Sequence, residues 1–97
     1  MNRPSTSLCV HRDEIRRIVA KNQAVNARVF GSALDGNDGE NSDLDILVDA
    51  LPGTTLFDLG AIQVELEELL GVPVDVATPG DLSPKFRQEV LNKAQPI

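Results

Sequence analysis

The chain has 97 residues, of which 41% are hydrophobic, so it is long enough for one domain with a modest core. It carries 15 acidic and 9 basic residues, which gives a net charge of -6. Every Lys and Arg lies at or before Arg28 or at or after Lys85, so the central part of the chain is an anionic surface. Such a surface should repel nucleic acid, and we therefore expect no direct nucleic-acid partner.

Nothing in the sequence indicates a membrane or a secretory route. No apolar run approaches the roughly 20 residues that span a bilayer, and the N-terminal residues lack the apolar core of a signal peptide. Cys9 is the only cysteine and cannot form an internal disulfide. His11 is the only histidine and has no partners for a zinc site. We expect a soluble, cytoplasmic protein without a membrane partner, folded as one domain over residues 1–97.

The first half of the chain predicts a helix followed by two strands. Residues 7–22 form the helix, because their apolar residues recur at helical spacing. These residues are Leu8, Ile15, Ile18 and Val19. Alternating apolar residues then predict a half-buried strand over residues 25–30. A polar loop over 33–42 leads to a second strand over 43–50, with alternate residues in the core.

The second half predicts a helix, a strand and a final helix. Thr54 or Thr55 caps a helix that runs to Leu70 and is stopped by Gly71. Its expected apolar stripe consists of Leu56, Leu59, Ile62, Leu66, Leu69 and Leu70. Three alternating valines predict a strand over residues 72–77. Ser83 and Pro84 read as the cap and first position of the last helix, which runs to about Ala94. Its inward residues should be Phe86, Val90 and Leu91.

This order, α-β-β-α-β-α, predicts an α+β fold with a small mixed sheet of three or four strands. The first two strands, joined by a loop, can be antiparallel. The helical crossover before the third strand suits a parallel neighbour. We expect the helices to pack on one face of the sheet.

The residues most suited to chemistry are carboxylates on the exposed side of two predicted strands. Asp43 and Asp45 project from the same side, about 7 Å apart along their strand. Asp75 is the charged residue on the exposed side of the third strand. If these strands are neighbours, the three carboxylates converge, repel one another and favour divalent ions that also bind phosphate. Gly31 permits close approach of a phosphate, and Ser32 offers a hydroxyl and an amide.

The complete pattern of strand, Gly-Ser turn, loop, Ser-Asp-x-Asp and later strand aspartate is far more specific than any of its parts. In this pattern the chain resembles the minimal nucleotidyltransferases of the DNA polymerase beta superfamily, and the likeness covers nearly the whole chain. The matching residues are Gly31, Ser32, Gly36, Ser42, Asp43, Asp45 and Asp75. The resemblance implies that Asp43 and Asp45 bind two Mg²⁺ ions and that Asp75 is a third metal ligand and the general base. The residues it implies in binding a nucleoside triphosphate are Gly31, Ser32 and Ser42.

Bacterial proteins with this resemblance are typically antitoxins paired with a HEPN ribonuclease toxin. The implied reaction transfers AMP from ATP to a tyrosine hydroxyl of that partner. This chain contains no tyrosine, so the acceptor must lie elsewhere.

Two alternatives arise from the loop. The resembling proteins often carry an arginine where this chain has Asp35, so an anion replaces a cation that would neutralise phosphate charge. This substitution suggests, as an alternative, a weak or inactive enzyme that neutralises its toxin by binding alone. The loop is also rich in oxygen ligands, but Glu40 and Ile46 stand where an EF-hand calcium loop has Gly and Glu. Its predicted flanks are strands, which argues against a calcium sensor.

Overall fold

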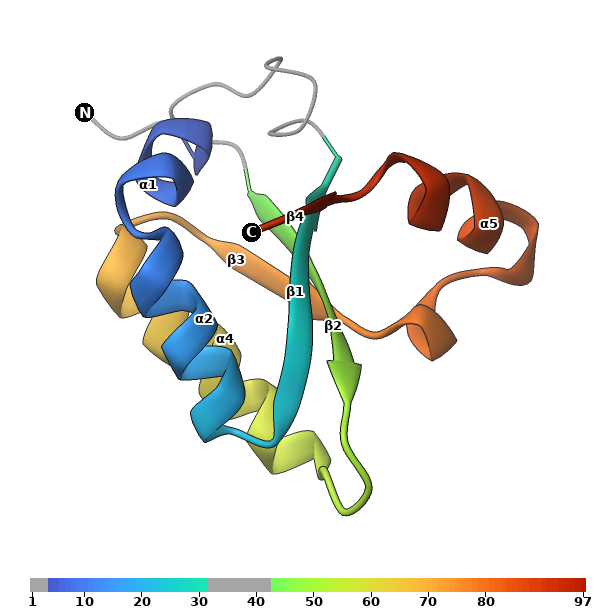
Figure 1. Ribbon diagram of the computed structural model, residues 1–97, viewed down its shortest axis with the longest axis horizontal. Helices are drawn as coiled ribbons and strands as arrows, with labels where there is room; N and C mark the ends of the chain where they lie inside the picture. The colour runs from blue at the N-terminus through green and yellow to red at the C-terminus, as the bar shows by residue number, and fades with distance from the viewer. Residues whose placement is uncertain (1–3, 32–42) are drawn as a thin grey trace.

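A computed structural model describes residues 4–31 and 43–97, which form a four-stranded mixed sheet with helices against it (Figure 1). The strand order is β3-β2-β1-β4. The elements in chain order are α1 (Pro4–Val10), α2 (Arg12–Lys21), β1 (Ala24–Phe30), β2 (Leu44–Ala50), α4 (Leu56–Leu70), β3 (Val74–Ala77), the 3-10 turn η1 (Pro79–Asp81), α5 (Pro84–Lys93) and β4 (Gln95–Pro96). The predicted α+β class is confirmed. No helix in the described ranges is long and apolar enough to cross a membrane.

The strand directions follow the lengths of the connections, as predicted. β1 and β2 are antiparallel, whereas β2 and β3 are parallel and joined through α4. The sequence did not predict β4, which is too short to show any periodicity. It pairs antiparallel with β1, and the Ile97 N–H donates to the Ala27 carbonyl at 2.9 Å.

The ends of α4 are set by local side-chain and backbone chemistry. The Thr55 Oγ1 accepts from the Asp58 N–H at 3.2 Å, and the Asp58 carboxylate accepts from the Thr55 N–H at 2.9 Å, which forms a capping box. At the other end Gly71 adopts a φ of 71°, in the left-handed region that glycine enters without steric cost. The helix therefore begins and ends where the sequence predicted.

The hydrophobic core lies between the sheet and helices α1, α2 and α4. Its members are Leu8, Ile15, Val19, Ala24, Ala27, Val29, Leu44, Ile46, Val48, Ile62, Leu66, Leu70, Val72, Val74 and Ile97. The Ser7 hydroxyl ties α1 to α4 by donating to the Leu70 carbonyl at 3.0 Å. Leu47 is also fully buried but lies outside this cluster, because alternation places it on the opposite face of the sheet.

Two predictions for the N-terminal part were wrong in detail. The single helix over 7–22 is two helices, which start at Pro4 and divide at His11. The Nδ1 of His11 lies 2.5 Å from the Glu14 carboxylate in the first turn of α2. In β1, Asn26 has a φ of 58° and the pairing register shifts between Val25 and Arg28. The predicted alternation over residues 25–30 starts with Val25 as an apolar position, but this irregularity turns Val25 outward and Ala24 is buried instead.

Two other predicted inward residues face solvent. Leu56 is 84% exposed because it stands in the first turn of α4, beyond the edge of the core. Phe86 is 57% exposed, and none of the residues of α5 is buried. The prediction that all helices pack on one face of the sheet was wrong. Figure 1 shows that α5 lies on the opposite side of the sheet from α2 and α4, which explains why the predicted inward side of α5 does not reach the core.

Candidate active site

The paired strands β2 and β3 bring two of the predicted carboxylates together. Asp45 and Asp75 are register partners in the parallel pair, so their backbones are one strand spacing apart, about 5 Å. The neighbours of Asp45 in sequence, Leu44 and Ile46, are buried in the core. The Asp45 side chain therefore projects from the other face of the sheet, on the side where α5 lies.

The third carboxylate, Asp43, lies just before β2 rather than within it and is exposed. Asp75 is exposed as well, whereas Asp45 is partly buried. Burial raises the pKa of the Asp45 carboxyl above its ordinary value, and the negative charges of Asp75 and then Asp43 raise it further. The negative charges of Asp75 and Asp43 thus act on Asp45, and a cation bound beside Asp45 would relieve that repulsion.

Gly31 contacts this group of carboxylates from the end of β1. Its φ of +78° lies in the left-handed region, and it follows Phe30, the register partner of Asp45. A Cβ atom built on Gly31 would overlap Oδ2 of Asp45 and lie 3.3 Å from its carboxyl carbon. Only glycine therefore leaves the Asp45 carboxylate in this place, which is a reason for glycine here beyond the predicted phosphate contact.

The other predicted nucleotide-binding residues, Ser32 and Ser42, lie outside the described residues, as do Gly36 and Asp35. Their predicted roles stay predictions.

The donor set suits a hard divalent cation such as Mg²⁺, which prefers carboxylate oxygens. Within the described ranges, however, no three His, Cys, Asp or Glu side chains are grouped closely enough to hold a metal ion as they stand. Asp45 is the residue about which such a group would form, since both other carboxylates act on its pKa. Metal ligation by Asp43, Asp45 and Asp75 stays a prediction.

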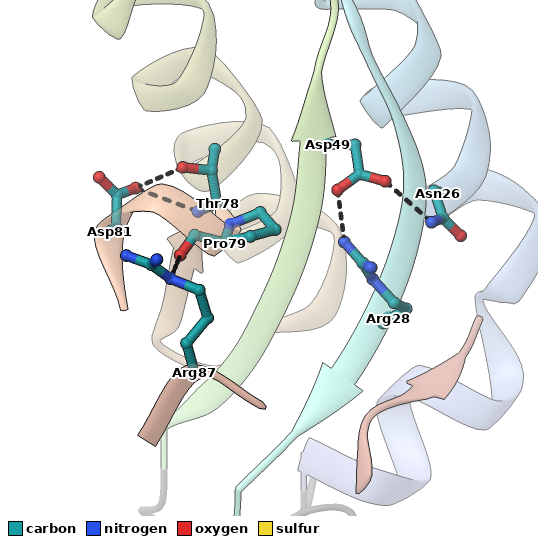
Figure 2. Close-up of polar contacts among 7 residues, drawn as sticks. All are labelled: Asn26, Arg28, Asp49, Thr78, Pro79, Asp81 and Arg87. Carbon is teal, nitrogen blue, oxygen red and sulfur yellow. Dashed lines mark hydrogen bonds and ion pairs between the residues drawn. The ribbon is translucent and has the colours of Figure 1, made fainter. Parts of the chain in front are cut away.

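Further along the same face, Arg28 and Asp49 form an ion pair that the sequence analysis missed (Figure 2). Arg28 Nη2 lies 2.8 Å from Asp49 Oδ1, and Asn26 Nδ2 donates to Asp49 Oδ2 at 2.9 Å. The hydrogen bond from Asn26 is the main cause of the lowered pKa of Asp49, and Arg28 adds to it. The Arg28 side chain is only 13% exposed. Strand alternation could have placed Arg28 on this face, because Arg28 precedes the inward Val29 and therefore lies on the same face as Phe30.

A second set of contacts shapes the chain where it leaves β3. The Asp81 carboxylate accepts from the Thr78 N–H at 3.0 Å, which closes η1. Arg87 donates from Nε to the Pro79 carbonyl at 2.8 Å (Figure 2). It also donates from Nη2 to the Leu82 carbonyl at 3.1 Å. These bonds fasten α5 to the turn after β3 and hold this helix on the same side of the sheet as Asp75.

The sheet order and the pairing of Asp45 with Asp75 are consistent with a nucleotidyltransferase. The chain belongs to the nucleotidyltransferase domain family, whose pattern matches residues 12–97. This finding confirms the enzyme class that the sequence predicted.

Relatives agree with this assignment. A protein of Methanocaldococcus jannaschii, provisionally named a protein adenylyltransferase, is 40% identical over 86 residues, which cover 84% of this chain and 92% of the relative. A solved structure provisionally described as a minimal nucleotidyltransferase superposes with a TM-score of 0.87 at 39% identity, covering 100% of this chain and 97% of the other. A toxin–antitoxin structure with AMP-PNP superposes with a TM-score of 0.73 at 23% identity, covering 87% of this chain and 69% of the other. At that identity it shows a shared fold alone.

Proposed function

We propose that this protein is a magnesium-dependent adenylyltransferase and antitoxin. It transfers AMP from ATP to a hydroxyl group of a HEPN ribonuclease toxin, and the proposed acceptor is a tyrosine hydroxyl. The observation that carries the proposal is the pairing of Asp45 with Asp75 across parallel strands in a chain of the nucleotidyltransferase family. The name of the M. jannaschii relative supports a protein acceptor, and the toxin–antitoxin structure with AMP-PNP that shares this fold supports the kind of partner.

In the proposed reaction the acceptor oxygen attacks the α-phosphorus of ATP. The bond from that phosphorus to the oxygen bridging to the β-phosphate breaks, and pyrophosphate leaves. Asp75 accepts the proton of the attacking hydroxyl. Asp43, Asp45 and Asp75 would hold the Mg²⁺, and Gly31, Ser32 and Ser42 would hold the phosphates. When bound, the metal neutralises charge on the phosphates and orients them for in-line displacement.

The contribution of the protein is therefore mainly positioning and charge stabilisation. Asp75 stands beside Asp45 in register, so the base and the principal metal ligand belong to one rigid sheet. The exposure of Asp75 leaves it accessible to a hydroxyl from another protein.

The test is to incubate the protein with the product of the neighbouring gene, Mg²⁺ and ATP labelled on the α-phosphate. We expect label on the partner, and no label with the Asp43→Ala plus Asp45→Ala double variant or with EDTA. An Asp49→Ala variant is a matched control, because it removes a carboxylate of the same strand that lies away from the proposed ligands. Label that is undiminished in the double variant would refute this mechanism.

The second candidate function is neutralisation of the toxin by binding alone. Asp35 favours it, because a carboxylate in the phosphate loop opposes nucleotide binding. On this alternative the protein relieves toxicity stoichiometrically and without ATP. Loss of relief in Asp43→Ala, with the complex still formed, would count against it.

A further inference from the structure

β3 lies at one edge of the four-stranded sheet that the described residues form, and β2 is its neighbour on the inner side. The Pro73 carbonyl accepts from the Leu44 N–H at 2.8 Å, so the backbone of Pro73 is directed toward β2. In a parallel ladder, successive residues direct their N–H and C=O groups to alternate sides. The N–H of Val74, the first residue of β3, is therefore directed to the outer edge, away from β2.

A side chain of α4 accepts the hydrogen bond from this N–H. Glu67 Oε2 lies 3.0 Å from the Val74 nitrogen. Val74 is 1% exposed, so water has almost no access to it. A buried N–H group without an acceptor is costly, because it has lost its hydrogen bonds to water. The Glu67 carboxylate thus takes the place that a further strand would have at this edge of the sheet.

Glu67 differs in this respect from the acidic residues around it. Glu65 pairs with Lys21, whereas Glu68 is exposed. Glu67 instead links the last turn of α4 to the strand that follows, seven residues further on. Its carbonyl also accepts from the Gly71 N–H at 2.9 Å, which closes the end of the helix. The main chain and the side chain of Glu67 therefore both shape the connection from α4 to β3.

Asp75 directly follows Val74 and is the register partner of Asp45. β3 has four residues, so few contacts hold its first residues in line. We propose that Glu67 is a positioning residue: by accepting the Val74 N–H it fixes the start of β3, and it so keeps Asp75 beside Asp45. The inference rests on the proposed function, in which Asp75 takes the proton of the attacking hydroxyl.

Glu67 acts through the backbone and not on the substrate. α4 packs on the core side of the sheet, whereas the Asp45 side chain projects from the other side, where α5 lies (Figure 1). The Glu67 carboxylate is moreover engaged by the Val74 N–H. Loss of Glu67 should therefore slow the chemical step and leave the binding of ATP nearly unchanged.

The first measurement is amide hydrogen exchange of the whole chain, followed by NMR without metal or nucleotide. Glu67→Ala removes the acceptor, whereas Glu67→Gln keeps a carbonyl oxygen on a side chain of the same length. Glu68→Ala is the matched control, because it removes an exposed carboxylate from the next position of α4. We expect Glu67→Ala to lower the protection of the Val74 and Asp75 amides at least about tenfold. Glu67→Gln and Glu68→Ala should retain the protection of the wild type.

The second measurement is the labelling of the partner with ATP, at a temperature at which circular dichroism shows every variant to be folded. Glu67→Ala should lower kcat at least about tenfold, which is part of what a general base contributes. Its KM for ATP should stay within about twofold of the wild type. Glu67→Gln should restore most of the rate, and Glu68→Ala should match the wild type. A residue that only stabilised the fold would leave kcat unchanged in the folded variant.

Three results would overturn the proposal. The first is protection of the Asp75 amide in Glu67→Ala that equals the wild type. The second is a folded Glu67→Ala variant that labels the partner as fast as the wild type does. The third is a Glu67→Gln variant that behaves as Glu67→Ala does, because the acceptor oxygen would then not matter. If the wild type labels no partner, the proposed function fails, and the exchange at Asp75 by itself decides whether Glu67 positions this residue.

Discussion

Replacing Gly31 with alanine should have two separate effects: a loss of stability from the backbone conformation, and a displacement of the Asp45 carboxylate. At a φ of +78° a Cβ atom carries a conformational cost of about 1–2 kcal/mol. The same Cβ would overlap Oδ2 of Asp45. That atom is the far end of a side chain, so Asp45 can rotate away at little further cost in stability. Its carboxylate then leaves the place beside Asp75.

The matched control is Gly53→Ala in the turn before α4. Gly53 has a φ of +91°, but a Cβ atom there would meet nothing within 4 Å. In thermal unfolding followed by circular dichroism both variants should lose stability similarly, with a fall in Tm of about 4–8 °C per kcal/mol. Only Gly31→Ala should also lose Mn²⁺ binding, measured by calorimetry, and labelling of the acceptor. If Gly31→Ala binds Mn²⁺ as the wild type does, the carboxylate does not depend on Gly31 and the reasoning is wrong.

Three further predictions follow from charges and burial. Because the pKa of Asp45 is raised in the folded protein, the stability linked to its protonated form is present below the unfolded value and is lost as pH rises through the folded value. Asp45→Asn should therefore be more stable than the wild type in urea at pH 7 with EDTA and equal to it in strong acid, whereas saturating Mg²⁺ should stabilise only the wild type, by about 2.7 kcal/mol at 100 times its Kd. The pKa of Asp49 is lowered, mainly by the hydrogen bond from Asn26 and further by Arg28. The stability from these contacts is therefore present above the unfolded pKa and is lost as pH falls through the folded pKa. Since Asp49 is 40% exposed, Arg28→Met should lower the free energy of unfolding by no more than about 1 kcal/mol at pH 7. This difference from the wild type should become smaller in acid. A difference that does not change with pH would show that packing rather than charge is lost. Leu66→Ala should cost about 2–5 kcal/mol in urea unfolding and Leu56→Ala less than about 0.5 kcal/mol, and equal costs would contradict the burial assigned to this helix.

The position of α5 bears on how an acceptor reaches the site. The helix lies on the same side of the sheet as the carboxylates (Figure 1), held by Arg87 to the turn after β3. It has no buried residue of its own. In the proposed reaction, a protein acceptor would approach Asp75 on the side of the sheet where α5 lies. The described part of the chain otherwise leaves Asp75 exposed.

Several features of this protein depend on interactions between residues close in sequence, and the sequence alone predicted them. The capping box at Thr55 and the left-handed Gly71 fix the ends of α4 through interactions within a few residues, so a linear sequence contains them. Strand alternation likewise placed Leu44 and Ile46 inward and Asp45 outward. The spacing of the Gly-Ser turn, the Ser-Asp-x-Asp segment and Asp75 was enough to indicate the enzyme family that the comparisons confirm.

Tertiary structure decided what depends on residues far apart in the chain. The overlap of Gly31 with Asp45 exists only because β1 and β2 are paired in one register, and the partnership of Asp45 with Asp75 only because β3 is their parallel neighbour. The exposure of Phe86 depends on where α5 crosses, on the side of the sheet opposite to α2 and α4. A helical stripe says which residues share a face, but the position of the helix in the fold decides what that face meets.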